Sequence, residues 1–119
     1  MGHVRVRVKI GNPSDRDLVE DVDGALVDTG ATLTTVPRAL ADRLKLDVLE
    51  QHQARTAAGT VTADESFAYF EYNGRKPVTP VWISDRYPDV LIGVVTLEAF
   101  GLKVDSRSGE LEETEFLLL

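Results

Sequence analysis

The chain has 119 residues, which is the length of one domain with a single hydrophobic core. Hydrophobic residues make up 43% of it and charged residues 28%, as in ordinary globular proteins, so general disorder is excluded. There is no cysteine and there are only two histidines, which excludes disulfides, thiol catalysis, thiolate metal sites and a multi-histidine metal site.

The charge and hydropathy patterns bear on partners and location. The net charge of −7 argues against nucleic acid or an anionic membrane as the main partner, because both select a basic surface. No apolar run approaches the roughly 20 residues of a membrane helix, and residues 1–10 alternate apolar and charged types instead of forming a signal-peptide core. We therefore expect a cytoplasmic protein that needs no cofactor and no metal.

The first half of the chain predicts strands around a short helix. Apolar and charged residues alternate from Val4 to Ile10, which is typical of a strand with one buried face. Turn residues follow at 11–15, and Pro37 fits the first turn of a helix that continues to Leu44. Further strands are expected at 18–28, with a kink or bulge at 21–24, and at 46–49, with a loop at 30–36.

The second half predicts two hairpins and a second helix. We expect a hairpin over 51–70 with Gly59 at its tip, and Asn73-Gly74 is a strong signal for the next hairpin turn. Trp82 alternates with its neighbours in the following strand, where either a core position or a cleft wall is possible. The remaining segments are a strand at 90–92, a helix at 96–100 ended by Gly101, a strand at 102–105 and an extended segment at 111–119.

The most informative string is Asp28-Thr29-Gly30, which follows the apolar run Ala25-Leu26-Val27. A buried strand thus delivers a carboxylate directly into a turn that contains glycine. A charged group next to a core is costly unless it has partners, so the position of Asp28 requires a reason. One reading is a catalytic carboxylate, and the other is an aspartate that closes a turn by bonding to its own backbone.

A second string favours the catalytic reading. Leu91-Ile92-Gly93 ends a hydrophobic run in a glycine, and Ala58-Gly59-Thr60 lies between the two strings. This order resembles the retropepsin-like aspartic proteases, with an Asp-Thr-Gly turn, a glycine-tipped flap hairpin and an apolar-apolar-Gly strand before a helix. The long form of both strings resembles the bacterial and archaeal members more than the viral ones.

The resemblance implies a fold and an assembly. The fold is mostly β, a closed or partly open β barrel with one or two short helices, with one lobe per chain and a single domain over 1–119. A chain with one Asp-Thr-Gly cannot supply the two carboxyls that the chemistry needs, so the family's solution is a homodimer with Asp28 from each subunit. Thr29 would bond across the dimer floor, and Gly30 would let the backbone turn and donate its N–H to the carboxylate.

The activity implied is that of an aspartic endopeptidase that hydrolyses peptide bonds in a peptide or protein substrate. The substrate would lie extended beneath the flap, where Ala58, Gly59 and Thr60 form the tip. Its side chains would contact apolar residues, for which we select five: Ala31, Val61, Ile83, Val90 and Ile92.

Two features of the sequence leave alternatives open. Viral members have an acidic residue and an arginine that pair near the site, and Thr32 and Val94 stand in those places here. Together with a glycine-poor flap, this keeps a second reading in view, a catalytically weak or inactive dimerisation or peptide-binding module. The apolar end, Phe116 to Leu119, would either interleave with its copy in a dimer sheet or pack on its own core.

Overall fold

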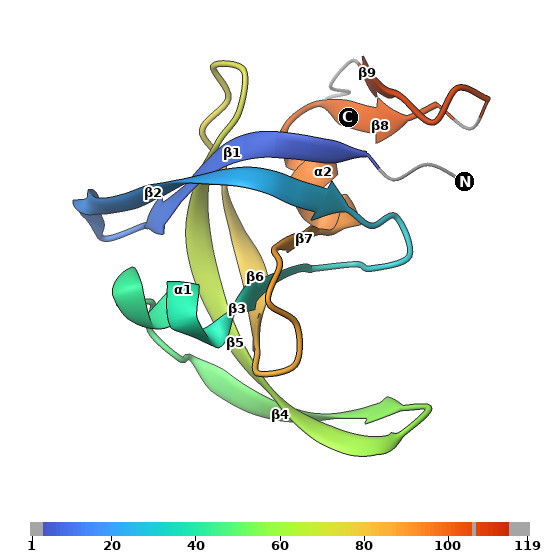
Figure 1. Ribbon diagram of the computed structural model, residues 1–119. Helices are drawn as coiled ribbons and strands as arrows, with labels where there is room; N and C mark the ends of the chain where they lie inside the picture. The colour runs from blue at the N-terminus through green and yellow to red at the C-terminus, as the bar shows by residue number, and fades with distance from the viewer. Residues whose placement is uncertain (1–3, 106, 115–119) are drawn as a thin grey trace, which may run out of the picture.

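The computed structural model describes residues 4–105 and 107–114, and these residues form strands with two short helices (Figure 1). Both helices have six residues, α1 at Arg38–Arg43 and α2 at Val94–Ala99. The strands are β1 Arg5–Asn12, β2 Asp15–Val27, β3 Thr34–Pro37, β4 Glu50–Thr56, β5 Gly59–Glu71, β6 Val78–Ser84, β7 Leu91–Ile92, β8 Leu102–Val104 and β9 Leu111–Glu113. The mostly β fold with two short helices is confirmed.

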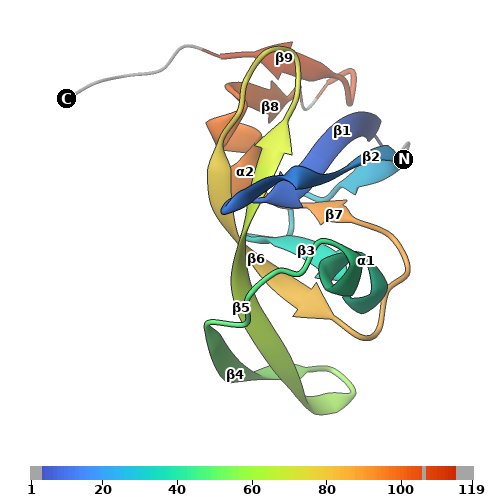
Figure 2. The same cartoon turned by 90° about the vertical axis from the view of Figure 1, so that its left-hand side faces the viewer.

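Seven strands form one sheet in the order β1-β2-β7-β3-β6-β5-β4. An additional antiparallel pairing joins β1 to β5 through Lys9↔Glu71, Ile10↔Phe70 and Gly11↔Tyr69, so the pairings return to the first strand as a closed ring. Strand β4 pairs only at the outer side of β5, and the β4–β5 hairpin extends away from the ring. The separate β8–β9 pair lies at the opposite end of the molecule (Figure 2).

The core fills the inner side of this ring. Alternate residues of β1 are buried, as the sequence pattern predicts, and Ile10 is fully buried. Phe70 and Phe100 pack edge to face with their ring centroids 6.2 Å apart, which brings β5 against the end of α2. Leu40, Ala41 and Leu44 attach α1 to the same core cluster. The core therefore holds both short helices against the strands that lead into them.

One predicted turn and one predicted strand irregularity are confirmed by backbone geometry. Asn73 and Gly74 have φ values of 49° and 79°, and the flanking residues Tyr72 and Arg75 bridge across the turn. The expected irregularity at 21–24 is also present, because the β1–β2 register shifts where Gly24 adopts a φ of 73°. Both positions depend on conformations that glycine and asparagine adopt at low cost.

The sequence prediction differs from the structure most at three places, besides shifts of one to three residues at other element ends. The predicted loop at 30–36 contains strand β3, because the β-branched run Thr34-Thr35-Val36 pairs in parallel with β6. The predicted strand at 46–49 is absent, and Val48 and Leu49 are 47% and 57% exposed in an irregular segment before β4. The tip of the hairpin, which the sequence predicts at Gly59, ends one residue earlier, at Ala58.

The hairpin turn consists of Ala57 and Ala58, because Thr56 pairs with Gly59 across it. Gly59 is the first residue of β5 and has a φ of 122°, a conformation that L side chains rarely adopt. The hairpin itself is confirmed, with β4 and β5 in continuous register from Glu50↔Glu65 to this turn.

The last predicted segment is only partly within the described residues. Strand β9 covers Leu111–Glu113 and pairs with β8, while the predicted dimer-sheet residues 116–119 lie outside the described part. Neither helix of the described residues is long and apolar enough to cross a membrane.

Candidate active site

Asp28 is the first residue after β2, and three hydrogen bonds fix its backbone and side chain. Its N–H donates to the Ile92 carbonyl at 2.9 Å, and its own carbonyl accepts from the Ala31 N–H at 3.1 Å. The Gly30 N–H donates to Asp28 Oδ1 at 3.0 Å. Asp28 is half-buried, whereas Thr29 and Gly30 are exposed. The turn thus holds one carboxylate in a fixed place at the surface of this chain.

The second glycine string packs directly against this turn. Backbone hydrogen bonds run from the Val94 N–H to the Ala31 carbonyl at 2.9 Å and from the Val95 N–H to the Thr32 carbonyl at 3.0 Å. Gly93 is buried between them in close contact with the backbone of residues 32 and 33. The Asp28 turn is therefore held in place by the start of α2 as well as by its own strand.

The strands around the turn form two parallel pairs that are joined to each other by an antiparallel contact. β2 runs parallel to β7, β3 runs parallel to β6, and the two short strands β3 and β7 meet antiparallel at Thr35↔Leu91. Parallel pairs need long crossover connections, and the Asp28 turn is the first segment of the connection from β2 to β7. The turn therefore follows a strand whose last residues pair on both sides, with β1 and with β7.

One face of this sheet is open next to Asp28. The cross-strand partners Leu26↔Leu91, Leu91↔Thr35 and Thr35↔Trp82 form a continuous row of half-buried side chains. Their chain neighbours, which face the other way, are buried: Ala25, Val27, Ile92, Thr34, Val36, Val81 and Ile83. Because side chains alternate along a strand, Asp28 shares the face of Leu26, two residues before it.

The sequence reasoning missed Leu26, Leu91 and Thr35 as members of this open face. A signal for Leu26 was available, since it stands two residues before Asp28 and so lies on the same face of the same strand. Leu91 and Thr35 become recognisable only through the pairing register of β3 and β7. Trp82 lies on this row, so of its two predicted positions the structure favours the open face over the core.

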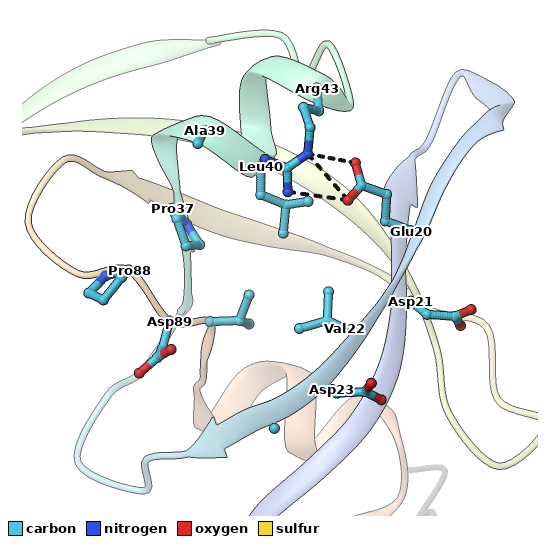
Figure 3. A pocket seen from close by; sticks show the side chains of 12 residues that line it. Glu20, Asp21, Val22, Asp23, Pro37, Ala39, Leu40, Arg43, Pro88 and Asp89 are labelled. Atoms are coloured by element: carbon cyan, nitrogen blue, oxygen red, sulfur yellow. Dashed lines mark hydrogen bonds and ion pairs between the residues drawn. The ribbon is translucent and has the colours of Figure 1, made fainter.

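The predicted substrate-binding residues fall into different places. Val61 and Ile83 line a pocket of about 490 Å³ together with Thr35 and Trp82, between the β4–β5 hairpin and the segment after β6. Val90 lines a separate pocket of about 320 Å³ between β2 and α1, where Arg43 pairs with Glu20 at 2.9 Å (Figure 3). The two pockets are lined by different residues.

Burial separates the predicted residues further. Ile83, Val90 and Ile92 are only 2%, 4% and 0% exposed and belong to the core cluster, so in the single chain they offer little surface. Ala31 is half-buried beside Asp28, and Ala58, Gly59 and Thr60 are exposed around the hairpin turn. A role of all these residues in substrate binding stays a prediction.

One group of side chains in the described residues could hold a metal ion. The ligand atoms of Glu50, His52 and Glu65 lie within 4.8 Å of one another on the β4–β5 hairpin. His52 Nε2 lies 2.9 Å from Glu65 Oε1, and the imidazole ring stands edge-on to Trp82 with centroids 5.4 Å apart. His52 thus already has a hydrogen-bond contact and an aromatic neighbour on this hairpin.

A ring of strands that presents an Asp-Thr-Gly turn against an apolar-apolar-Gly strand is the architecture of the aspartic proteases. The family model described as aspartyl protease matches residues 6–96, and the chain belongs to this family. The match contains both the Asp28 turn and Gly93, so the two strings that carried the resemblance lie within it. No match was found among curated protein sequences.

Solved structures confirm the retropepsin-like fold. The EIAV protease complexed with the inhibitor HBY-793 is 21% identical with a TM-score of 0.61, over 98% of this chain and 94% of that one. The simian foamy virus (mac) protease is 21% identical with a TM-score of 0.58, over 82% and 94%. A retropepsin-like aspartic protease from Rickettsia conorii is 18% identical with a TM-score of 0.59, over 88% and 76%.

Proposed function

We propose that this protein is an aspartic endopeptidase whose active site forms between two copies of the chain, with one Asp28 from each. The observation that carries the proposal is the setting of the Asp28 carboxylate, held by the Gly30 N–H in an exposed turn that is hydrogen-bonded to the backbone on both sides of Gly93. The chain supplies one such turn, and peptide hydrolysis by this chemistry requires two carboxyls. A symmetric pair provides the second one.

The two carboxyls divide the work through a shared proton. Two carboxylates in contact repel each other, so the pair holds one proton between them. The ionised member removes a proton from a bound water, which attacks the scissile carbonyl. The protonated member donates a hydrogen bond to that carbonyl and later helps to protonate the leaving amine. No covalent intermediate with the enzyme forms.

The open face next to Asp28 supports an extended peptide as the substrate. Leu26, Leu91, Thr35 and Trp82 form an apolar row that leads from the Asp28 turn toward the β4–β5 hairpin. An extended peptide could pair along such a surface as an added strand, with its alternate side chains in contact with the row. We assign the hairpin the role of a flap that excludes water when substrate is bound.

Asp28→Asn tests the proposal directly. Wild-type protein and the variant are incubated with a diverse peptide library between pH 4 and 7, and the products are identified by mass spectrometry. Cleavage by the wild type, its loss in Asp28→Asn and its retention in the exposed control Asp17→Asn are the expected results. Full activity of Asp28→Asn would remove the mechanism.

The same experiment separates the second candidate, a peptide-binding module without turnover. The exposed Thr32 and the apolar Val94 stand where an ion pair would otherwise brace the site, which favours a weaker catalyst. Peptides that bind the wild type and are recovered uncut across this pH range would support the module and exclude the endopeptidase.

A further inference from the structure

A single peptide unit connects Asp28 to a group of buried hydroxyls. The carbonyl of the Ile92–Gly93 peptide accepts the Asp28 N–H at 2.9 Å. The N–H of the same peptide donates to Thr34 Oγ1 at 3.0 Å. The plane of this peptide is therefore clamped from both sides, and any rotation of it moves the backbone of Asp28.

The hydroxyl of Thr34 is the first of three that are joined by hydrogen bonds. Thr34 Oγ1 donates to Thr96 Oγ1 at 2.7 Å, and Thr96 Oγ1 lies 2.9 Å from Thr79 Oγ1. Thr34 Oγ1 thus accepts from the Gly93 N–H and donates to Thr96, while either hydroxyl can be the donor in the bond between Thr96 and Thr79. Such a chain of hydrogen bonds in a dry interior polarises and strengthens each member.

The burial of this chain is nearly complete. Thr34 and Thr96 are 0% exposed and Thr79 is 3% exposed, and they come from three elements, β3, α2 and β6. A buried hydroxyl lowers stability unless it is bonded, and a valine of the same shape would fill the space without that cost. Core packing alone therefore does not explain three adjoining threonines here, whereas a need to orient the Ile92–Gly93 peptide does.

We propose that Thr96 is a positioning residue for the Asp28 carboxylate. It touches neither substrate nor Asp28 and acts through Thr34 and the Ile92–Gly93 peptide. This inference rests on the proposed peptidase function. Loss of the Thr96 hydroxyl leaves Thr34 without its acceptor, so the clamp on the peptide loosens and the two Asp28 carboxyls lose their alignment. Since substrate binds elsewhere, we expect kcat to fall by about 10- to 100-fold with KM little changed.

The test compares Thr96→Val, which keeps the shape and removes the hydroxyl, with Thr96→Ser, which keeps the hydroxyl. Ile10→Val, at a fully buried position of β1 outside the group of hydroxyls, controls for a loss of packing. The expected result is a lower kcat in Thr96→Val, recovery toward wild type in Thr96→Ser, and no change per folded molecule in Ile10→Val. Equal kcat in Thr96→Val and wild type, or no recovery in Thr96→Ser, would overturn the proposal. If Thr96→Val does not fold, Thr79→Val is measured in its place: it leaves Thr96 with one hydroxyl partner fewer, so kcat should fall in the same direction by a smaller factor, and an unchanged kcat would overturn the proposal.

Amide hydrogen exchange keeps this inference separable from the proposed function. In Thr96→Val the Gly93 and Asp28 amides should exchange faster than in wild type, while the amides of β1 remain unchanged. This holds for the folded protein whether or not it cleaves peptides. Unchanged protection of Gly93 and Asp28 would contradict the positioning role, whereas absent cleavage by the wild type with the predicted exchange pattern would refute only the peptidase.

Discussion

Gly93 and Leu33 are in backbone contact so close that no side chain fits between them. A Cβ atom built on Gly93 would lie 2.5 Å from the Leu33 carbonyl carbon and 2.6 Å from its oxygen. Real Cβ atoms essentially never approach that closely, so the backbone at Gly93 or at Leu33 would have to move. Position 93 therefore requires glycine, because its close contact with Leu33 holds the Asp28 turn in place.

Gly93→Ala should push the backbone at Gly93 away from the backbone at Leu33. We expect the free energy of unfolding to fall by about 1–3 kcal/mol, as for other overpacked sites, and peptidase activity to be lost because Asp28 is displaced. Urea unfolding and a peptide cleavage assay measure both effects. Thr32→Ala is the matched control, since it shortens an exposed side chain in the same contact without adding an atom. Wild-type stability in Gly93→Ala would refute the close contact.

Leu91 and Ile92 are adjacent in sequence but face opposite sides of the sheet. Ile92 is fully buried in the core, so Ile92→Ala should lower the free energy of unfolding by about 2–5 kcal/mol. Leu91 is half-buried on the open face, so Leu91→Ala should lower stability less and raise KM or change the cleaved sequences. Urea unfolding and steady-state kinetics distinguish the two. If Ile92→Ala altered specificity and Leu91→Ala did not, the assignment of the two faces would be wrong.

Arg38 links α1 to two aspartates on neighbouring elements. Its Nε lies 2.9 Å from Asp85 Oδ1, and its Nη2 lies 2.7 Å from Oδ2 of Asp64, whose Oδ1 is buried without a hydrogen-bond partner among the described residues. The hydrogen bond from Arg38 holds the pKa of Asp85 below its ordinary value. The contribution of this pair to stability is therefore complete above about pH 3.8 and is lost as the pH falls through the lower pKa of the folded state.

Asp85→Asn should accordingly be less stable than wild type at pH 6. The difference between the two should shrink as the pH is lowered below about 3.8, because wild-type Asp85 then becomes protonated as well. Urea midpoints measured between pH 2.5 and 6 test this, with the exposed Asp17→Asn as the control. A difference that stays constant over the whole range would show that the Arg38–Asp85 pair does not act through charge.

The sequence was sufficient to predict features that depend on local chemistry. The Asn73-Gly74 turn follows from the positive φ that both residues tolerate, and the β1 strand follows from its alternation. The Asp28 turn and the Gly93 strand were recognised as strings, and the family match contains both. Each of these depends on a few adjacent residues.

Features that depend on pairing between distant strands could not be predicted in the same way. The sequence predicts a loop where strand β3 lies, because a strand of only four residues gives a weak signal until its partners β6 and β7 are known. Whether the side chains of Ile83, Val90 and Ile92 face the core or the open face likewise depends on strands far along the chain. A shift of the pairing register by one residue would exchange the two faces. The 46–49 segment shows the reverse case: its strand-forming residues do not form a ladder, although the Leu49 N–H donates to the Glu65 carbonyl at 2.8 Å.

The central claim is that one active site is built from two chains, and mixing subunits tests it most directly. Wild-type protein and Asp28→Asn are unfolded together in varied ratios, refolded and assayed at a fixed total concentration. If a site needs Asp28 from both subunits, activity falls with the square of the wild-type fraction and is about one quarter at an equal mixture. A linear fall, with about one half of the activity remaining at that mixture, would contradict the shared site.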